Sequence, residues 1–528
     1  MTLRRQLAQL FVVRASGFAT DNQRRYPRWE LGNTELQQWL EQGVGGVILL
    51  GGSAADLALR CRQLQQWAGS TDQNRLLLCA DVEEGVGQRF EGATWLVPPL
   101  ALAPLWQAEP QRAEALARAY GRCTGNEAQL LGLNWVLAPV CDVNNNPANP
   151  VINVRAWGET AAATTALSRA FLQGLEGEGV LGCAKHFPGH GDTSQDSHLQ
   201  LPQLAHSRER LDELEFVPFR AAIAAGVGSV MTAHLQLPAL DPERPATLSK
   251  AVLSQLLRQE LGFNGLIVTD ALVMEAITKH YGAAEAAALA FEAGADLILM
   301  PADTDAALTA LEQGCLEGRW PLERVEQSLE RRRLALARCK PSELDTAAAL
   351  SALANCASSH GALAQELLQL SLQQQGCNSA PPKGPGVNLI RVDSSLACSP
   401  LPLAAPALLR PQAAGLQTTL IDGRSQALDL EKLPNGPVLL QLFVRGNPFR
   451  GSAGADGYWA ELVQKLLAQQ RLAGLVVYGS PYLWQELKGL IPANIAIAYS
   501  PGQMPGAQAL ALQSLGLGAA SYEGGFTN

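Results

Sequence analysis

Short apolar runs recur along the first 340 residues, with amphipathic segments rich in alanine and leucine between them. The runs that have the length and composition of buried strands are LAQLFVV near residue 10, GVILLGG (46–52), LLLCADVE (76–83), WVLAPVCDV (135–143), LGCAKHF (181–187), SVMTAHL (229–235), GLIVTDA (265–271) and ADLILMP (295–301). This alternation is typical of β-α units around a parallel sheet. Eight such units predict an α/β fold, a (β/α)8 TIM-type barrel.

Polar side chains gather at the carboxyl ends of these runs. They are Asp81, Asp142, Lys185, His186, His234 and Asp270. In a barrel of this kind, the carboxyl ends of the strands form the active-site face. A doubly wound open sheet would give a similar pattern, and the number of strands favours the barrel.

The pattern changes after Lys340. An Ala/Leu/Gln segment from Asp345 to Gln375 predicts a helix, and GCNSAPPKGPG then indicates a flexible connection. Strand-like runs (NLIRV, PVLLQLFV, LAGLVVYGS, NIAIAYS) alternate with helical ones in the remainder. We therefore expect a catalytic barrel over 1–340, a helical linker and connection over 341–385, and a smaller three-layer α/β domain over 386–528.

Composition narrows the classes of partner. The 528 residues include 40 basic and 49 acidic side chains, a formal charge of −9, which disfavours nucleic-acid binding. No apolar run is long enough for a membrane span, and the first residues lack the features of a secretion signal. The ten cysteines form no C-x-x-C pair and several lie in apolar runs, which favours buried thiols. We expect a cytoplasmic protein with neither nucleic-acid nor membrane partners.

Three of the seven histidines fall in one stretch, KHFPGHGDTSQDSH, which begins at Lys185. Its glycines and proline predict a loop that leaves the fifth strand. Asp196 lies two residues before His198 and could orient its imidazole for proton transfer. Two other interpretations stay open: the histidines only cap turns, or they bind zinc together with Asp192 or Asp196. Their spacing matches no metal signature, so we expect no metal or other cofactor.

Several motifs resemble glycoside hydrolase family 3, in its bacterial β-N-acetylglucosaminidase branch. KHFPGHG followed by D-S-H is similar to a signature of that branch. ADVEEGVGQRF (80–90), NPVINVRAWG (149–158) and GFNGLIVTDALVMEAI (262–277) resemble further family segments in matching order. The family commonly pairs a barrel with a second α/β domain, which agrees with the predicted break near 341.

The resemblance implies roles for individual residues. Asp270 would be the nucleophile and His198 the general acid/base, oriented by Asp196. The residues implied in sugar binding are Asp81, Arg89, Arg155, Lys185 and His186. Asp270 could instead cap a helix formed by ALVMEAI, and the two arginines could be surface ion-pair residues.

The function implied is that of an exo-acting, retaining β-N-acetylglucosaminidase that removes terminal GlcNAc from small carbohydrate substrates, with muropeptide fragments of peptidoglycan as the natural source. Three alternatives stay open: a GlcNAc phosphorylase or a β-glucosidase of the same family, a sugar-binding protein without turnover, and a metal-dependent hydrolase. The sequence does not determine the oligomeric state.

Overall fold

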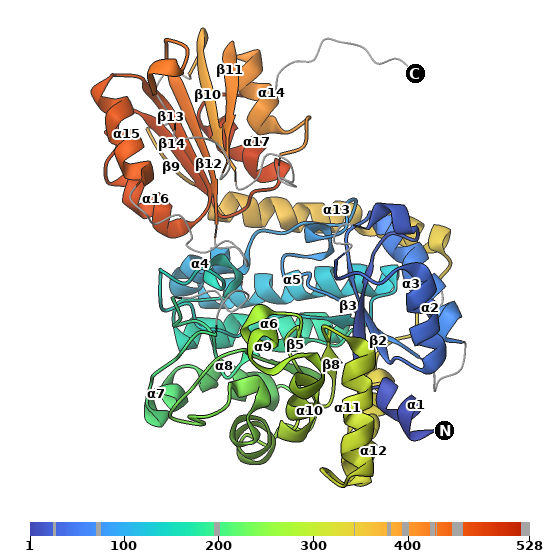
Figure 1. The fold of residues 1–528 in the computed structure, drawn as a ribbon. Coiled ribbons are helices and arrows are strands. Elements are labelled where there is room, and N and C mark those ends of the chain that lie inside the picture. Colours follow the sequence, from blue (N-terminus) through green and yellow to red (C-terminus); the bar gives the residue numbers. More distant parts are fainter. Residues whose placement is uncertain are drawn as a thin grey trace. The chain divides into compact units, whose positions relative to one another are not determined.

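The computed structural model describes residues 1–528 except 25–27, 70–74, 195–200, 343, 377–381, 393–400, 423–427, 429, 446–457 and 519–528. The chain divides into two compact units, residues 1–363 and 364–528. Figure 1 shows helices around the strands of the first unit and on both faces of the sheet in the second. No helix among the described residues is long and apolar enough to cross a membrane.

Each of the eight predicted runs in the first unit contains a strand. The strands are β1 (Phe11–Ser16), β2 (Gly46–Leu50), β3 (Leu77–Ala80), β4 (Trp135–Val136), β5 (Cys183–Phe187), β6 (Ser229–Thr232), β7 (Leu266–Val268) and β8 (Ile298–Leu299). Neighbouring strands pair in parallel in the orders β4-β3-β2-β1-β8 and β5-β6-β7. Bridges from Trp135 to Leu181 and from Val268 to Leu297 join the two groups into a ring. The strands therefore form the predicted (β/α)8 barrel.

Helices precede, connect and follow these strands. They are α1 (Leu3–Ala8), α2 (Asn33–Gln42), α3 (Ala54–Ala68), α4 (Ala103–Ala108), α5 (Pro110–Leu131), α6 (Ala161–Gly177), α7 (Arg208–Glu213), α8 (Phe216–Ala224), α9 (Glu275–Tyr281), α10 (Ala283–Ala293), α11 (Thr304–Leu316) and α12 (Leu322–Arg338). A π-helix spans Ala251–Glu260. The first predicted run was assigned partly wrongly, since its residues Leu7 and Ala8 end α1. The Thr2 hydroxyl accepts a hydrogen bond from the Arg5 amide and caps this helix.

Helices α5 and α6 approach each other closely because glycines lie at their contact. A Cβ atom on Gly121 would come within 2.1 Å of the Phe171 carbonyl oxygen, and one on Gly174 within 2.1 Å of the Arg118 carbonyl oxygen. Only glycine permits backbones this near to each other. The opposite face of α5, two residues further along, carries Cys123, which is also buried.

Helix α13 (Thr346–Ser371) follows the barrel, and strand β9 (Gln373–Gln375) forms an edge of the second sheet, where it pairs antiparallel with β14. The prediction of helix as far as Gln375 was wrong at this end, because the backbones of Gln373–Gln375 pair with β14 as a strand instead of continuing the helix. The remaining strands are β10 (Gly386–Arg391), β11 (Leu416–Ile421), β12 (Val438–Val444), β13 (Leu472–Gly479) and β14 (Ala496–Ser500), in the order β11-β10-β12-β13-β14-β9.

The sheet of the second unit is covered on both faces. Helices α15 (Tyr458–Ala468) and α16 (Pro481–Lys488) pack on one side, and α14 (Pro406–Ala413) and α17 (Pro505–Ser514) pack on the other. Each side has its own apolar core, so the unit has three layers as predicted. The predicted fold class, a barrel followed by a smaller α/β domain, is confirmed.

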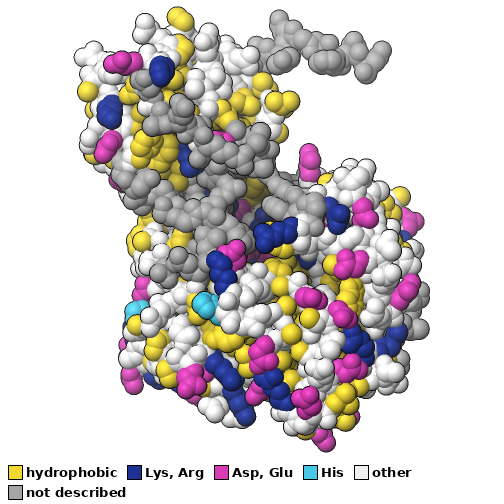
Figure 2. Space-filling view, in the orientation of Figure 1, with side chains coloured by type: hydrophobic (Ala, Val, Ile, Leu, Met, Phe, Trp, Pro, Cys, Tyr) yellow, Lys and Arg dark blue, Asp and Glu magenta, His cyan; other side chains and the backbone are white. Residues whose placement is uncertain are grey.

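The thiols follow the compositional expectation in the described part of the chain. The eight described cysteines are free, and six of them are buried. Cys377 and Cys398 lie outside the described residues. On the face of the barrel unit seen in Figure 2, acidic and basic side chains are interspersed rather than gathered by sign.

Candidate active site

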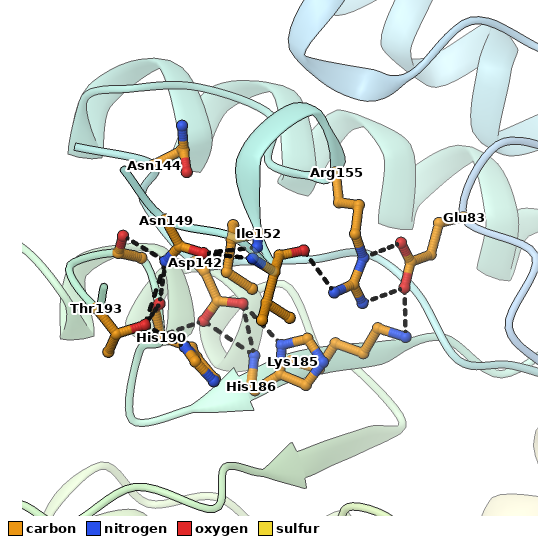
Figure 3. A network of polar contacts seen from close by, with 12 residues as sticks. Glu83, Asp142, Asn144, Asn149, Ile152, Arg155, Lys185, His186, His190 and Thr193 are labelled. Carbon is orange, nitrogen blue, oxygen red and sulfur yellow. Dashed lines mark hydrogen bonds and ion pairs between the residues drawn. The ribbon is translucent and has the colours of Figure 1, made fainter. Parts of the chain in front are cut away.

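The predicted site residues that the structure describes lie at the carboxyl ends of the barrel strands. Asp81 directly follows β3, Lys185 and His186 lie within β5, and Asp270 comes two residues after β7. Parallel strands in a closed barrel bring these ends to one face. Figure 3 shows two polar networks there, which meet at β5.

The first network centres on Glu83, a residue for which the sequence gave no predicted role. Its Oε1 lies 2.7 Å from Lys185 Nζ and 2.7 Å from Arg155 Nη2, and its Oε2 accepts a bond of 2.8 Å from Arg155 Nε. Lys185 Nζ also lies 2.8 Å from Asp81 Oδ1. The two carboxylates and the two cations thus form one connected cluster. Figure 3 shows its Glu83, Arg155 and Lys185 side chains.

Burial sets the electrostatics of this cluster. Burial alone would raise the pKa of Glu83, but the Arg155 guanidinium and the Lys185 ammonium hold it well below its usual range. Burial would likewise lower the pKa of Lys185, yet Asp81 and Glu83 raise it above the ordinary lysine value. All of these groups except Asp81 are nearly inaccessible, with side-chain exposures of 2% for Lys185 and 39% for Asp81. The charges of Glu83, Arg155 and Lys185 are therefore fixed in position and persist at neutral pH.

Arg89 joins this region at its edge. Its Nε donates to the main-chain oxygen of Asp81 at 3.1 Å, and its side chain is exposed. The alternative that Arg155 is a surface ion-pair residue is wrong, because its side chain is only 11% exposed and its partner Glu83 is buried. The structure thus brings Lys185 into contact with Asp81 and, through Glu83, links it to Arg155. Arg89 lies beside Asp81.

The second network holds the loop that follows β5. Asp142 is fully buried, and its carboxylate accepts from His186 Nδ1 at 2.8 Å and from the His190 amide at 2.7 Å. Burial would raise the pKa of Asp142, but His186 and the His190 amide lower it. Because an ionised carboxylate only accepts hydrogen bonds, His186 Nδ1 carries a proton and its Nε2 is directed away from this contact.

Asn149 ties two site loops together. Its Nδ2 donates to the carbonyl oxygens of His190 and Gly191, both at 2.8 Å, and its Oδ1 accepts from the amides of Val151 and Ile152. The asparagine-rich segment that leads to Arg155 is thereby anchored to the loop after β5. Gly191 is required at this point, since a Cβ atom there would lie 1.7 Å from the Val143 carbonyl oxygen.

Asp270 is held by backbone contacts. Its amide donates to Thr232 Oγ1 at 3.4 Å, and its Oδ1 accepts from the Ala271 amide at 2.7 Å. His234 Nε2 lies 3.2 Å from the Ala271 oxygen. The alternative that Asp270 caps a helix is wrong, because the next helix, α9, starts at Glu275 and has Met274 at its N-cap. The carboxylate is half-buried at the barrel face.

Asp196 and His198 lie outside the described residues. The chain on either side of them is anchored to the barrel. Before them, Asp192 Oδ2 lies 2.9 Å from His206 Nε2. After them, the Leu204 amide donates to the Gln236 oxygen at 2.9 Å.

Sequence reasoning missed Glu83, and it gave Asp142 and Asn149 no role. One available signal was the run of acidic residues after β3, in which Glu83 stands two residues from Asp81. Another was the density of asparagines between 144 and 153. Together the described residues present fixed hydrogen-bond donors and acceptors at the same face of the barrel as the Asp270 carboxylate.

Comparisons with known proteins show which family this chain resembles along its length. Residues 2–333 match the glycosyl hydrolase family 3 N terminal domain, and residues 381–516 match the bacterial glycosyl hydrolase family 3 C-terminal domain. A protein of Pseudoalteromonas piscicida named Beta-hexosaminidase A is 38% identical over 276 residues, or 49% of this chain and 46% of that protein. This chain therefore spans about half the length of that relative.

Two further proteins are similar over a larger share of their own length. A Beta-hexosaminidase of Neisseria meningitidis serogroup C is 35% identical over 274 residues, 52% of this chain and 75% of that protein. The solved structure of a glycoside hydrolase family 3 beta-N-acetylglucosaminidase from Paenibacillus sp. str. FPU-7 aligns with a TM-score of 0.77 and 30% identity. That alignment covers 98% of this chain and 97% of the other, so both units have counterparts there.

Proposed function

Because this chain belongs to glycosyl hydrolase family 3, we propose that it is an exo-acting, retaining β-N-acetylglucosaminidase. The names of its relatives, Beta-hexosaminidase and beta-N-acetylglucosaminidase, support this activity. One observation carries the proposal: the ion-paired cluster of Asp81, Glu83, Arg155 and Lys185 lies at the same end of the barrel as Asp270. That arrangement combines a polar binding surface with a carboxylate nucleophile.

The cluster would bind the hydroxyl and acetamido groups of the terminal sugar. Arg155 donates three N–H groups to Glu83 and to the Val151 oxygen, which leaves two of its five for a ligand. Asp81 is the more exposed carboxylate and can accept from sugar hydroxyls, while its contact with Lys185 orients it. Because these groups are already positioned, little conformational entropy is lost when the sugar binds.

Asp270 would attack the anomeric carbon and form a covalent glycosyl-enzyme as the bond to the leaving oxygen breaks. The Ala271 amide fixes the carboxylate from one side. His198 would protonate the leaving oxygen, and as a neutral imidazole it would then take a proton from the water that hydrolyses the intermediate. Asp196 would orient this imidazole, which exchanges protons readily near neutral pH. Two displacements return the anomeric carbon to its original configuration.

The finer substrate we propose is a muropeptide fragment of peptidoglycan with GlcNAc at its non-reducing end. Its test compares GlcNAc-anhydroMurNAc with chitobiose at equal concentration. A preference for the muropeptide fragment supports this assignment, and faster cleavage of chitobiose contradicts it.

The activity is tested with the purified chain and nitrophenyl β-GlcNAc, with the β-glucoside as comparison. We expect release from the GlcNAc substrate, retention of configuration by NMR, and a loss of at least roughly 1,000-fold in Asp270→Asn, as other covalent catalysts show when their nucleophile is removed. Asp305→Asn changes a side chain that is 71% exposed on α11 and serves as the matched control.

Other outcomes would overturn parts of the proposal. Sugar 1-phosphate formed only when phosphate is present would identify a phosphorylase. Turnover confined to the glucoside would identify a β-glucosidase. GlcNAc binding without turnover in the unaltered chain would leave a sugar-binding protein. Activity lost on chelation while the barrel unit stays folded would favour a metal-dependent hydrolase.

A further inference from the structure

A second group of reactive side chains lies on two helices of the first unit, apart from the strand ends. Cys123 and Glu127 stand on α5, and His360 stands on α13. One ligand atom from each, the cysteine sulfur, a carboxylate oxygen and an imidazole nitrogen, lie within 4.8 Å of one another. The proposed glycosidase mechanism uses none of them.

The spacing of these residues suits a site between two helices. Cys123 and Glu127 are four residues apart and therefore lie on one face of α5. Cys356 stands four residues before His360 on α13, so these two side chains also share a face. The thiol of Cys356 lies near enough to Cys123 to influence its ionisation. Each helix thus presents a pair of potential ligands to the same region.

The environment of Glu127 favours a cation. Its side chain is 2% exposed, and among the described residues His360, at 2.9 Å, is the basic side chain paired with it. Thr94 donates to both carboxylate oxygens, at 2.9 Å from its amide and 2.5 Å from its hydroxyl. The neighbouring Cys123 is equally buried. A buried carboxylate beside a thiol is a region of negative potential that a bound cation would stabilise.

We propose that Cys123, Glu127 and His360 bind a zinc ion. Sulfur and imidazole nitrogen together with one carboxylate are a zinc donor set, whereas calcium and magnesium prefer oxygen ligands alone. Zinc bonds of about 2.0–2.3 Å hold tetrahedral ligand atoms about 3.5 Å apart, so small side-chain rotations close the observed spacing. The Cys123 thiol releases its proton to solvent as the sulfur–zinc bond forms.

Such an ion would be structural. It would link α13 to α5. Because Thr94 donates hydrogen bonds to Glu127, the ion would also be connected to the loop of residues 84–96 that contains Thr94. The Gly87 amide donates to the Thr94 oxygen at 2.9 Å, so the same loop is closed on itself. Because no step of the glycosidase proposal passes through this ion, metal binding is tested independently of turnover.

The test uses the full chain with a thiol-free reductant. After incubation with zinc and desalting, elemental analysis should give one equivalent of metal, and cobalt substitution should give a sulfur-to-cobalt charge-transfer band. Cys123→Ser should abolish that band. Loss of a residue that only orients a metal ligand lowers metal affinity by roughly 10- to 100-fold. Because Cys123 and His360 would be ligands themselves, Cys123→Ser and His360→Gln should each weaken zinc binding by at least that much. Cys61→Ser, a buried thiol on α3, and His280→Gln, an exposed histidine on α9, are the matched controls.

Circular dichroism checks that each variant folds. If Cys123→Ser does not fold, His360→Gln carries the test, since its side chain is 13% exposed and tolerates change more readily. The proposal is overturned if the unaltered chain retains no stoichiometric zinc. It is also overturned if binding and the cobalt band persist in Cys123→Ser, because the cluster is then only a hydrogen-bonded contact between helices.

Discussion

Replacing Glu83 with glutamine tests whether burial gives the ion-paired cluster its strength. Glu83 and Asp81 contact the same Lys185 ammonium, at 2.7 and 2.8 Å. Their side chains differ in exposure, at 6% for Glu83 and 39% for Asp81. Asp81→Asn is therefore a matched control in which the partner and the distance are almost unchanged and the surroundings differ.

The expected magnitudes follow from that difference. Glu83→Gln leaves Arg155 without its carboxylate in a buried position, and loss of one partner of a buried pair costs about 3–5 kcal/mol. Lys185 keeps Asp81, which places the expected loss in the free energy of unfolding near the lower end, about 3 kcal/mol. Asp81→Asn removes a more solvated partner and should cost less than about 1 kcal/mol.

The assay must report on the barrel unit alone. Pulsed hydrogen exchange of peptides from β5 across a urea series gives the unfolding midpoint of that unit, and linear extrapolation gives the free energy. The measurement is made near pH 7, where Glu83 is ionised because its pKa is depressed. If Glu83→Gln costs no more than Asp81→Asn, the carboxylate is not a buried charge and the electrostatic reasoning is refuted.

Two further changes test other parts of the site. Gly191→Ala would place a methyl group 1.7 Å from the Val143 oxygen. It should destabilise the barrel by about 1–3 kcal/mol and lower activity, whereas Gly177→Ala, where nothing lies within 4 Å, should stay within about 0.5–1 kcal/mol of the original in urea unfolding. The lowered pKa of Asp142 means that its stabilisation is present above about pH 4 and is lost as the pH falls through the folded-state pKa. In Asp142→Asn, the free energy of unfolding should therefore fall less steeply with pH below about pH 4 than in the original chain. An unchanged slope would show that Asp142 is not the carboxylate whose protonation destabilises the barrel.

The sequence predicted the barrel strands well because parallel strands buried on both faces read as continuous apolar runs. It failed where an element depends on a distant partner. Strand β11 has two exposed positions and reads as polar, and β9 consists of three glutamines that pair with a strand over 100 residues later. The prediction for Leu7 and Ala8 failed because a short apolar run fits a helix end and a strand equally well.

In the candidate site, too, the sequence predicted some residues and missed others whose position depends on distant partners. Asp81, Arg155 and Lys185 were found through motifs, and the structure brings them together. Glu83 has no periodicity that distinguishes it from its acidic neighbours, and its partner Arg155 is 72 residues away in sequence. Which carboxylate points inward depends on the turn after β3, and a single sequence does not specify that turn.

The pairing of β1 with β8 has a consequence for biosynthesis. Phe11 pairs with Ile298, so 287 residues separate the first strand from its second neighbour. At roughly 5–20 residues per second, translation leaves that edge of β1 unpaired for about 15–60 s. An unpaired strand edge is a template for association with other chains. We therefore expect nascent chains that stop before residue 299 to aggregate or to occupy chaperones, whereas chains that extend past β8 can close the ring.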